Sequence, residues 1–165
     1  MVRMTARQAF ALAAAACALL LGYGYFLQHV QGLEPCPLCL VQRAFFYAVI
    51  GVCVVAAVHG RWFLFYATLG TLFAAGGAAA ASRQVWLQHL PADKVPQCGP
   101  DLFFMLENFP LSRTFSTLFS GTGECAVVDW TFLGLSIAEW SLFWFVALAL
   151  YFVWIAVAKE RRVNA

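Results

Sequence analysis

The sequence alternates between long apolar runs and short polar connections. Four of the runs approach the ~20 residues that an α-helix needs to cross ~30 Å of hydrocarbon. They predict membrane-spanning helices over residues 10–29, 40–58, 62–81 and 140–158. The pattern therefore predicts an all-α membrane protein, with four transmembrane helices bundled in a single domain over residues 1–165.

The connections between these runs differ greatly in length. The second and third runs are joined by the three residues His59 to Arg61, whereas the third and fourth are separated by a loop over residues 82–139. Several prolines interrupt this loop, which argues against a second folded domain within it. Loops of this length in a small protein are usually functional or mobile, so we expect functional residues in it.

Composition supports a membrane protein and excludes one class of function. The chain is 63% hydrophobic and only 11% charged, with a mean hydropathy of +0.78. Soluble domains carry roughly a quarter charged residues. The formal net charge of +2 is too small to indicate a nucleic-acid-binding protein, and no nucleic acid partner is expected.

The distribution of charge predicts the orientation in the membrane. Four spans place both termini on one side, and that side carries Arg3, Arg7, Arg61, Lys159, Arg161 and Arg162. Of the eight acidic residues only Glu160 falls there. The positive-inside rule makes this side cytoplasmic. The first run begins like a signal peptide but extends past the length of a signal core, so we expect it to remain as the first span.

The six cysteines divide according to this topology. Cys17 and Cys53 fall within spans, and we expect Cys17 to be a small buried core residue. The other four map to the outer side, where an oxidising compartment permits lasting disulfides. Four cysteines allow three pairings. The outer four are Cys36, Cys39, Cys98 and Cys125.

Cys36 and Cys39 form a C-x-x-C motif at the outer end of the second span. Pro35 and Pro37 favour an extended entry followed by a helix start. The positive end of a helix stabilises a thiolate, as in other C-x-x-C pairs. Arg43 lies one helical turn beyond Cys39. It either holds a thiolate, polarises the carbonyl of an electron acceptor in the membrane, or extends outward to the interface.

The C-x-x-C motif has three chemical interpretations. A zinc site would need Cys98 and Cys125 as further ligands, and their wide separation disfavours it, so no metal is expected. A structural disulfide across two intervening residues removes little entropy from the unfolded chain, which disfavours a purely structural role. The third interpretation is a redox-active pair.

The loop cysteines Cys98 and Cys125 have two interpretations. They either brace the loop or form an accessible disulfide that an outside thiolate attacks. Two cysteine pairs on one face favour a redox relay.

These residues resemble the DsbB family of membrane disulfide-bond formation proteins over essentially the whole chain. The resemblance is carried by "QHVQGLEPCPLCLVQR" from Gln28, by "SRQVWLQHLP" at the end of the third span, by the outer Cys98 and Cys125, and by "DWTFLGLSIAEWSL" before the fourth span. A C-x-x-C motif alone would be weak. Its place at the second span, followed by Gln-Arg and a later cysteine pair, is specific.

The resemblance implies a thiol:quinone oxidoreductase of the bacterial inner membrane that reoxidises DsbA, a periplasmic thioredoxin-fold protein. By motif position, the thiolate of DsbA attacks Cys98 in its disulfide with Cys125. Cys125 is then displaced and reoxidised by exchange with the Cys36 and Cys39 pair. Cys39 passes electrons to a membrane quinone, ubiquinone or menaquinone, and Arg43 stabilises the anionic acceptor.

The sequence departs from the family pattern at one position. Some family members have a histidine near the quinone at the position that Gln84 occupies in this chain. The resemblance therefore implies that Gln84 contacts the cofactor. A glutamine donates a hydrogen bond but carries no proton at neutral pH. His29 and His89 lie near the outer interface and are alternatives as proton donors.

Two other functions remain as alternatives. One is a relative of vitamin K epoxide reductase, in which the loop cysteine pair usually precedes the C-x-x-C motif, whereas here it follows. The other is a non-enzymatic scaffold protein whose disulfides only brace the loop.

Overall fold

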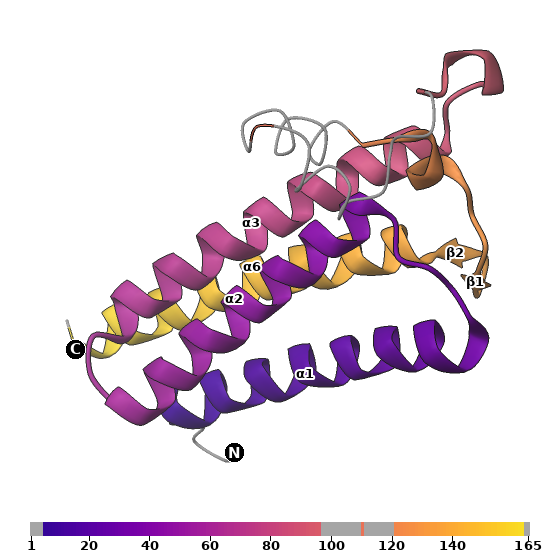
Figure 1. Cartoon of the computed structure of the whole chain (residues 1–165). Coiled ribbons are helices and arrows are strands. Elements are labelled where there is room, and N and C mark those ends of the chain that lie inside the picture. Colours follow the sequence, from indigo (N-terminus) through magenta and orange to yellow (C-terminus); the bar gives the residue numbers. More distant parts are fainter. Residues whose placement is uncertain (1–4, 97–109, 111–120, 164–165) are drawn as a thin grey trace.

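Four long helices make up most of the structure, a computed structural model that describes residues 5–96, 110 and 121–163 (Figure 1). They are α1 (Ala6–Gln31), α2 (Pro37–His59), α3 (Phe63–Gln88) and α6 (Ile137–Val163). Each contains a stretch long and apolar enough to cross a membrane. The predicted four-helix membrane fold is therefore confirmed.

The ends of α1 and α2 follow from local sequence. Thr5 caps α1 through a reciprocal capping box with Gln8, which satisfies amides that the helix itself leaves unpaired. Gly32 and Gly60 end α1 and α2 in the left-handed conformation, at φ of 70° and 67°. Only glycine adopts this conformation at little cost. The connections on either side of α2 are consequently short and tightly defined.

The third helix is longer than the hydrophobic pattern predicts. It continues to Gln88, whereas the apolar run predicts an end at residue 81. No proline or glycine occurs between Ser82 and Leu90, and Pro91 is the first residue that interrupts helical hydrogen bonding. The first part of the predicted loop is therefore a helical extension, and it places Gln84 opposite the start of α2.

Small elements gather at one end of the bundle (Figure 1). They are η1 (Ala92–Lys94), η2 (Gly123–Ala126) and an antiparallel hairpin of β1 (Thr131–Phe132) and β2 (Leu135–Ser136). Leu133 and Gly134 form the hairpin turn with positive φ angles of 53° and 79°, as a two-residue turn matched to strand twist requires. The start of α1 and the end of α6 lie at the opposite end (Figure 1).

Packing follows the order α1, α2, α3, α6. Helix α3 packs along both α2 and α6, and α1 packs along α2, whereas α1 and α6 touch sparingly. Phe145 is fully buried and stacks on Phe46, with ring centroids 4.1 Å apart. It lies against Gly77, where a Cβ atom would collide with its ring. Cys17 and Cys53 are also fully buried, which confirms Cys17 as a core residue.

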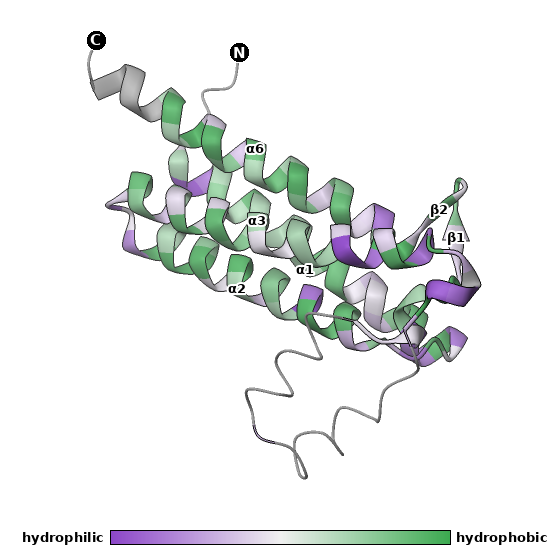
Figure 2. Cartoon of the chain, turned by 90° about the horizontal axis from the view of Figure 1, so that it is seen from above, coloured by the Kyte–Doolittle hydropathy of each residue, from purple (hydrophilic) through white to green (hydrophobic). Residues whose placement is uncertain are grey.

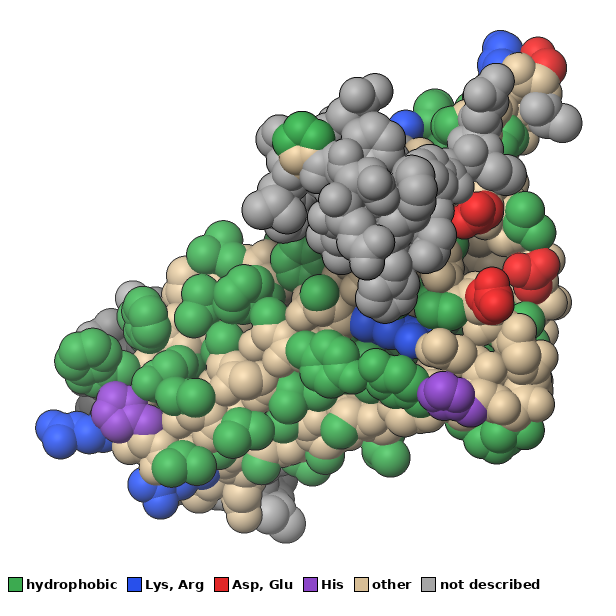
Figure 3. Space-filling view, viewed as in Figure 1, with side chains coloured by type: hydrophobic (Ala, Val, Ile, Leu, Met, Phe, Trp, Pro, Cys, Tyr) green, Lys and Arg blue, Asp and Glu red, His purple; other side chains and the backbone are tan. Residues whose placement is uncertain are grey.

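The surface of the bundle is suited to lipid. Apolar residues line the middle of the helices and polar residues collect toward their ends (Figure 2). On the face shown in Figure 3, acidic side chains gather only at the end that carries the hairpin. This end corresponds to the side that the charge pattern predicts to be outside.

Candidate functional site: a dithiol beside an apolar cavity

The dithiol formed by Cys36 and Cys39 lies at the start of α2. Cys36 is the N-cap residue, and its Sγ accepts a hydrogen bond from the backbone N–H of Cys39 at 3.4 Å. Pro37 occupies the first helical turn, where its lack of an N–H costs nothing. The two Sγ atoms are 3.0 Å apart. The local sequence therefore holds both sulfurs at the positive end of a helix.

Cys125 comes from η2 and meets this dithiol through Cys36. It is fully buried between Leu38 and Leu87, and its backbone N–H donates to the carbonyl oxygen of Thr122 at 2.9 Å. Gly121, at φ 75°, precedes this turn, and a Cβ there would strike both leucines. The approach of η2 to α2 thus requires a glycine.

Hydrogen bonding between Cys36 and Cys125 gives the two thiols different acidities. The Cys36 thiol, assisted by the backbone of Leu38 and Thr122, lowers the pKa of Cys125 to about 6 against the opposing effect of burial. The same contact with Cys125, followed by that with Cys39, raises the pKa of Cys36. Cys36 therefore keeps its proton at neutral pH, while Cys125 is largely a thiolate.

Gln84 lies against the sulfurs of the dithiol. Its Nε2 is 3.3 Å from Sγ of Cys39 and 3.4 Å from Sγ of Cys36. Its Oε1 accepts a 2.6 Å hydrogen bond from Nε2 of Gln42. Gln84 does not line the cavity described below, whereas Gln42 does. The contact that the structure gives Gln84 is therefore with sulfur.

Arg43 is held by neutral groups one helical turn beyond Cys39. Its Nη1 donates to Oε1 of Gln28 at 2.6 Å, and its Nη2 donates to the carbonyl oxygen of Gly24 at 3.3 Å. The guanidinium carbon lies 4.7 Å from the centre of the Tyr25 ring. Because the amide of Gln28 and the carbonyl of Gly24 carry no charge, they orient the guanidinium without neutralising it.

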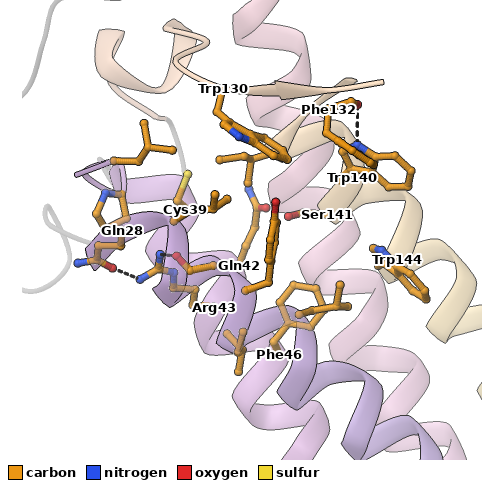
Figure 4. A pocket seen from close by; sticks show the side chains of 18 of the residues that line it. Gln28, Cys39, Gln42, Arg43, Phe46, Trp130, Phe132, Trp140, Ser141 and Trp144 are labelled. Atoms are coloured by element: carbon orange, nitrogen blue, oxygen red, sulfur yellow. Dashed lines mark hydrogen bonds between the residues drawn. The ribbon is translucent and has the colours of Figure 1, made fainter. Parts of the chain in front are cut away.

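A cavity of about 500 Å³ opens beside Cys39 and Arg43, bounded by α1, α2, α6 and the hairpin (Figure 4). Its lining is mostly apolar and aromatic. The Nε1 of Trp140 donates to the carbonyl oxygen of Phe132 at 3.1 Å and so fastens the hairpin over α6. The labelled lining residues are Gln28, Cys39, Gln42, Arg43, Phe46, Trp130, Phe132, Trp140, Ser141 and Trp144.

The size and lining of this cavity suit a small, largely apolar ligand. Its volume falls within the range of small-molecule sites. Aromatic side chains supply apolar walls, and Arg43 adds a positive charge to the lining. Cys39 lines the same cavity, so a sulfur and a cation border one space.

The structure brings together most of the residues singled out from the sequence. Cys36, Cys39, Cys125, Arg43 and Gln84 gather at one end of the bundle, whereas Cys98 lies outside the described residues. The sequence interpretation missed Gln28 and Gln42. Nor did it assign Trp130 and Trp140 to a site, although both line the cavity. The sequence signal for Gln42 was its place between Cys39 and Arg43 on one helical face.

Comparison with known proteins identifies the family. Residues 6–155 match the family model described as "Disulfide bond formation protein DsbB". A disulfide bond formation protein B from Methylococcus capsulatus is 49% identical over 89% of this chain and 92% of its own length. One from Hahella chejuensis is 47% identical over 96% and 98%, and one from an Acidovorax strain is 46% identical over 94% and 90%. The chain therefore belongs to the DsbB family of disulfide bond formation proteins.

Proposed function

We propose that the chain is a thiol:quinone oxidoreductase that reoxidises a DsbA-type thioredoxin-fold partner. Electrons pass from the partner through Cys98 and Cys125, then through Cys36 and Cys39, to a membrane quinone. The observation that carries the proposal is the contact of Cys125, on η2, with Cys36 at the start of α2, because it brings a loop cysteine to the dithiol whose second member, Cys39, lines the cavity. A brace for the loop would need no such contact.

The first half of the relay is thiol–disulfide exchange. A thiolate of the partner attacks Cys98, a bond forms between these two sulfurs, and Cys125 leaves with the electron pair. The second thiolate of the partner then releases the oxidised partner and leaves Cys98 reduced. A low-pKa thiol is a good leaving group, and the pKa of Cys125, about 6, suits this role.

The second half transfers the two electrons to the dithiol. The Cys125 thiolate attacks Cys36 in its disulfide with Cys39, and Cys39 leaves as a thiolate. Cys98 then attacks Cys125, which restores the loop disulfide and releases Cys36. The contact between Cys36 and Cys125 supports this route, because the attacking sulfur must reach Cys36 first.

The residues around the cavity fit a quinone as the final acceptor. A bound quinone supplies a two-electron, two-proton oxidant that reaches the site through the hydrocarbon. Arg43 provides a fixed positive charge beside a carbonyl oxygen, a preorganised arrangement that stabilises developing negative charge. Cys39 provides the electrons and, with Cys36, returns to the disulfide.

We further propose the bacterial inner membrane as the location, with both termini in the cytoplasm and the redox cysteines on the periplasmic side. The basic residues near both termini support this orientation through the positive-inside rule. The gathering of acidic side chains at the hairpin end agrees with it (Figure 3).

Two trapping experiments test the relay. A Cys125→Ser variant should form a mixed disulfide between Cys98 and an oxidised thioredoxin-fold partner, because the Cys98 thiolate opens the partner's disulfide and no Cys125 sulfur is present to displace the partner from Cys98. A variant with Cys39→Ser and Cys98→Ser should form a Cys36–Cys125 disulfide on oxidation, detected by peptide mass spectrometry. The matched control, Cys36→Ser with Cys98→Ser, should leave Cys39 and Cys125 as thiols.

Quinone reduction tests the acceptor. The purified chain in lipid should reduce a soluble ubiquinone or menaquinone analogue when supplied with a reduced partner, as followed by quinone absorbance. No quinone reduction, despite efficient trapping, would show that the electrons leave by another route.

A further inference from the structure

We propose that Gln42 and Gln84 form a buried amide pair that donates a hydrogen bond to the sulfur of Cys39. In this pair Gln84 contacts the reacting atom, and Gln42 is a positioning residue that fixes the direction of the Gln84 amide. The inference rests on the proposed function, because it gives a role to these side chains when Cys39 carries negative charge during electron transfer.

The two amides are among the most buried polar groups in the described part of the chain. Gln42 and Gln84 are each only 4% exposed. A buried polar side chain is costly unless it is hydrogen-bonded. Here a direct bond of 2.6 Å joins the two side chains, and the remaining N–H groups of Gln84 face the sulfurs.

The bond from Gln42 selects one of the two orientations of the Gln84 amide. Because Gln42 donates to Oε1 of Gln84, the Nε2 of Gln84 points to the sulfur of Cys39 at 3.3 Å. Turning the Gln84 amide over would bring two donors face to face. The distance from Sγ of Cys39 to Oε1 is longer, 3.6 Å, and that oxygen is already occupied. Without Gln42, Gln84 would be free to accept from a thiol instead.

Cys39 needs this donor because Cys36 has a single proton to give. The Cys36 thiol lies 3.0 Å from Sγ of Cys39 and also hydrogen-bonds with Cys125. When the Cys36 thiol donates its proton to Cys125, it cannot also donate to Cys39. Among the side chains that contact Cys39 here, Gln84 is then the remaining donor. A thiolate in an apolar setting depends strongly on such donors. An amide also donates at every pH, whereas an imidazole changes its charge near neutrality.

The alkylation rate of Cys39 measures this effect directly. The full-length protein is reduced and treated with iodoacetamide at pH 7, and modified Cys39 is quantified by peptide mass spectrometry, since the thiolate is the reacting form. Gln84→Met and Gln42→Met replace each amide with an apolar side chain of similar length. Gln88→Met is the control, because Gln88 lies on the same helix but accepts from Ser136 at 2.8 Å instead of contacting sulfur.

We expect Cys39 alkylation to slow roughly tenfold in both Gln84→Met and Gln42→Met, the lower end of the effect of losing a hydrogen bond to a charged group. Gln88→Met should stay within twofold of the unsubstituted protein. Cys53, which is fully buried, should remain unmodified in every variant that keeps its fold. If Gln42→Met slowed Cys39 alkylation no more than Gln88→Met does, the proposal would be overturned.

A second substitution keeps the test decisive if Gln84→Met does not fold. Gln42→Glu removes the donor to Oε1 of Gln84 and attracts the Gln84 amide away from the sulfurs. It should slow alkylation more than Gln42→Met, and an unchanged rate would refute the positioning role. The assay contains no quinone, so failure of quinone reduction by the unsubstituted protein would count against the proposed function alone.

Discussion

Arg43 donates a 2.6 Å hydrogen bond from Nη1 to Oε1 of Gln28, and this contact joins α1 to α2 beside the dithiol. The Nη2 of the same guanidinium donates to the carbonyl oxygen of Gly24 at 3.3 Å. Two neutral acceptors on one helix therefore fix the direction of a cation on the next. The orientation of Arg43 toward the cavity depends on a residue that never contacts sulfur.

Replacing Gln28 should weaken acceptor binding through Arg43. In Gln28→Leu the Nη1 donor loses its partner while Nη2 keeps its contact with Gly24. We therefore expect the KM for a quinone analogue to rise about fivefold, the size of one ordinary hydrogen bond. Steady-state kinetics with a reduced partner give the value. Tyr47→Phe is the control, since it removes only the 2.9 Å contact with the Tyr25 hydroxyl. Equal KM values for Gln28→Leu and Tyr47→Phe would contradict the role of Gln28.

Replacing Arg43 itself should have a larger effect. Arg43→Met removes the fixed charge from the cavity wall, and we expect the KM for quinone to rise at least tenfold, with the rate of partner trapping at Cys98 unchanged. Arg43→Lys keeps a charge but loses the planar fork that contacts both Gln28 and Gly24. It should fall between Arg43→Met and the unsubstituted protein. Unchanged quinone kinetics in Arg43→Met would remove Arg43 from the acceptor site.

The reduced protein should lose stability as the pH falls, because of Cys125. Its pKa of about 6 lies below the ordinary value of 9.0. The resulting stability is complete above pH 9 and is lost as the pH falls through 6; it is about 1 kcal/mol at neutral pH. Thermal unfolding of the reduced chain and of Cys125→Ser should therefore differ more at pH 8 than at pH 5. A difference that is the same at both pH values would contradict the thiolate assignment.

Two glycine-to-alanine substitutions should have opposite effects on stability. In Gly77→Ala the new Cβ collides with the buried Phe145 ring, and we expect a loss of about 1–3 kcal/mol, typical of overpacking. In Gly51→Ala nothing lies within 4 Å of the new atom, so removing a helical glycine should stabilise the protein by roughly 0.5–1 kcal/mol. Unfolding in detergent, followed by circular dichroism, compares the two. Similar changes in both variants would argue against the close contact of α3 with α6.

The hydrophobic pattern was sufficient to predict the helices, because each must bury its backbone polar groups within a span of fixed length. It was less informative at the helix ends, where water satisfies the backbone and length is unconstrained. The extension of α3 to Gln88 therefore escaped the prediction, and so did the hairpin. Strands of two residues are too short for an alternating pattern to show.

Within the candidate site, the sequence indicated the cysteines and Arg43 but not their partners. The spacing of Cys39 and Arg43 along one helix is a local property, and it is visible in the sequence. The contacts of Gln28 with Arg43 and of Gln42 with Gln84 join different helices, and no local spacing encodes them. The contacts of Gln84 with the two sulfurs also join different helices and were not visible in the sequence, and its cofactor contact stays a prediction.

The position of Cys36 as the N-cap of α2 bears on the speed of the relay. Its backbone is fixed between two prolines, yet its sulfur lies within reach of both Cys39 and Cys125. Exchanging one disulfide partner for the other then requires rotation about the bonds of a single side chain. Such rotations take picoseconds to nanoseconds when unhindered, whereas helix movements take microseconds or longer. We therefore expect turnover to be limited by docking of the partner and by sulfur chemistry, with the four helices acting as a stationary frame.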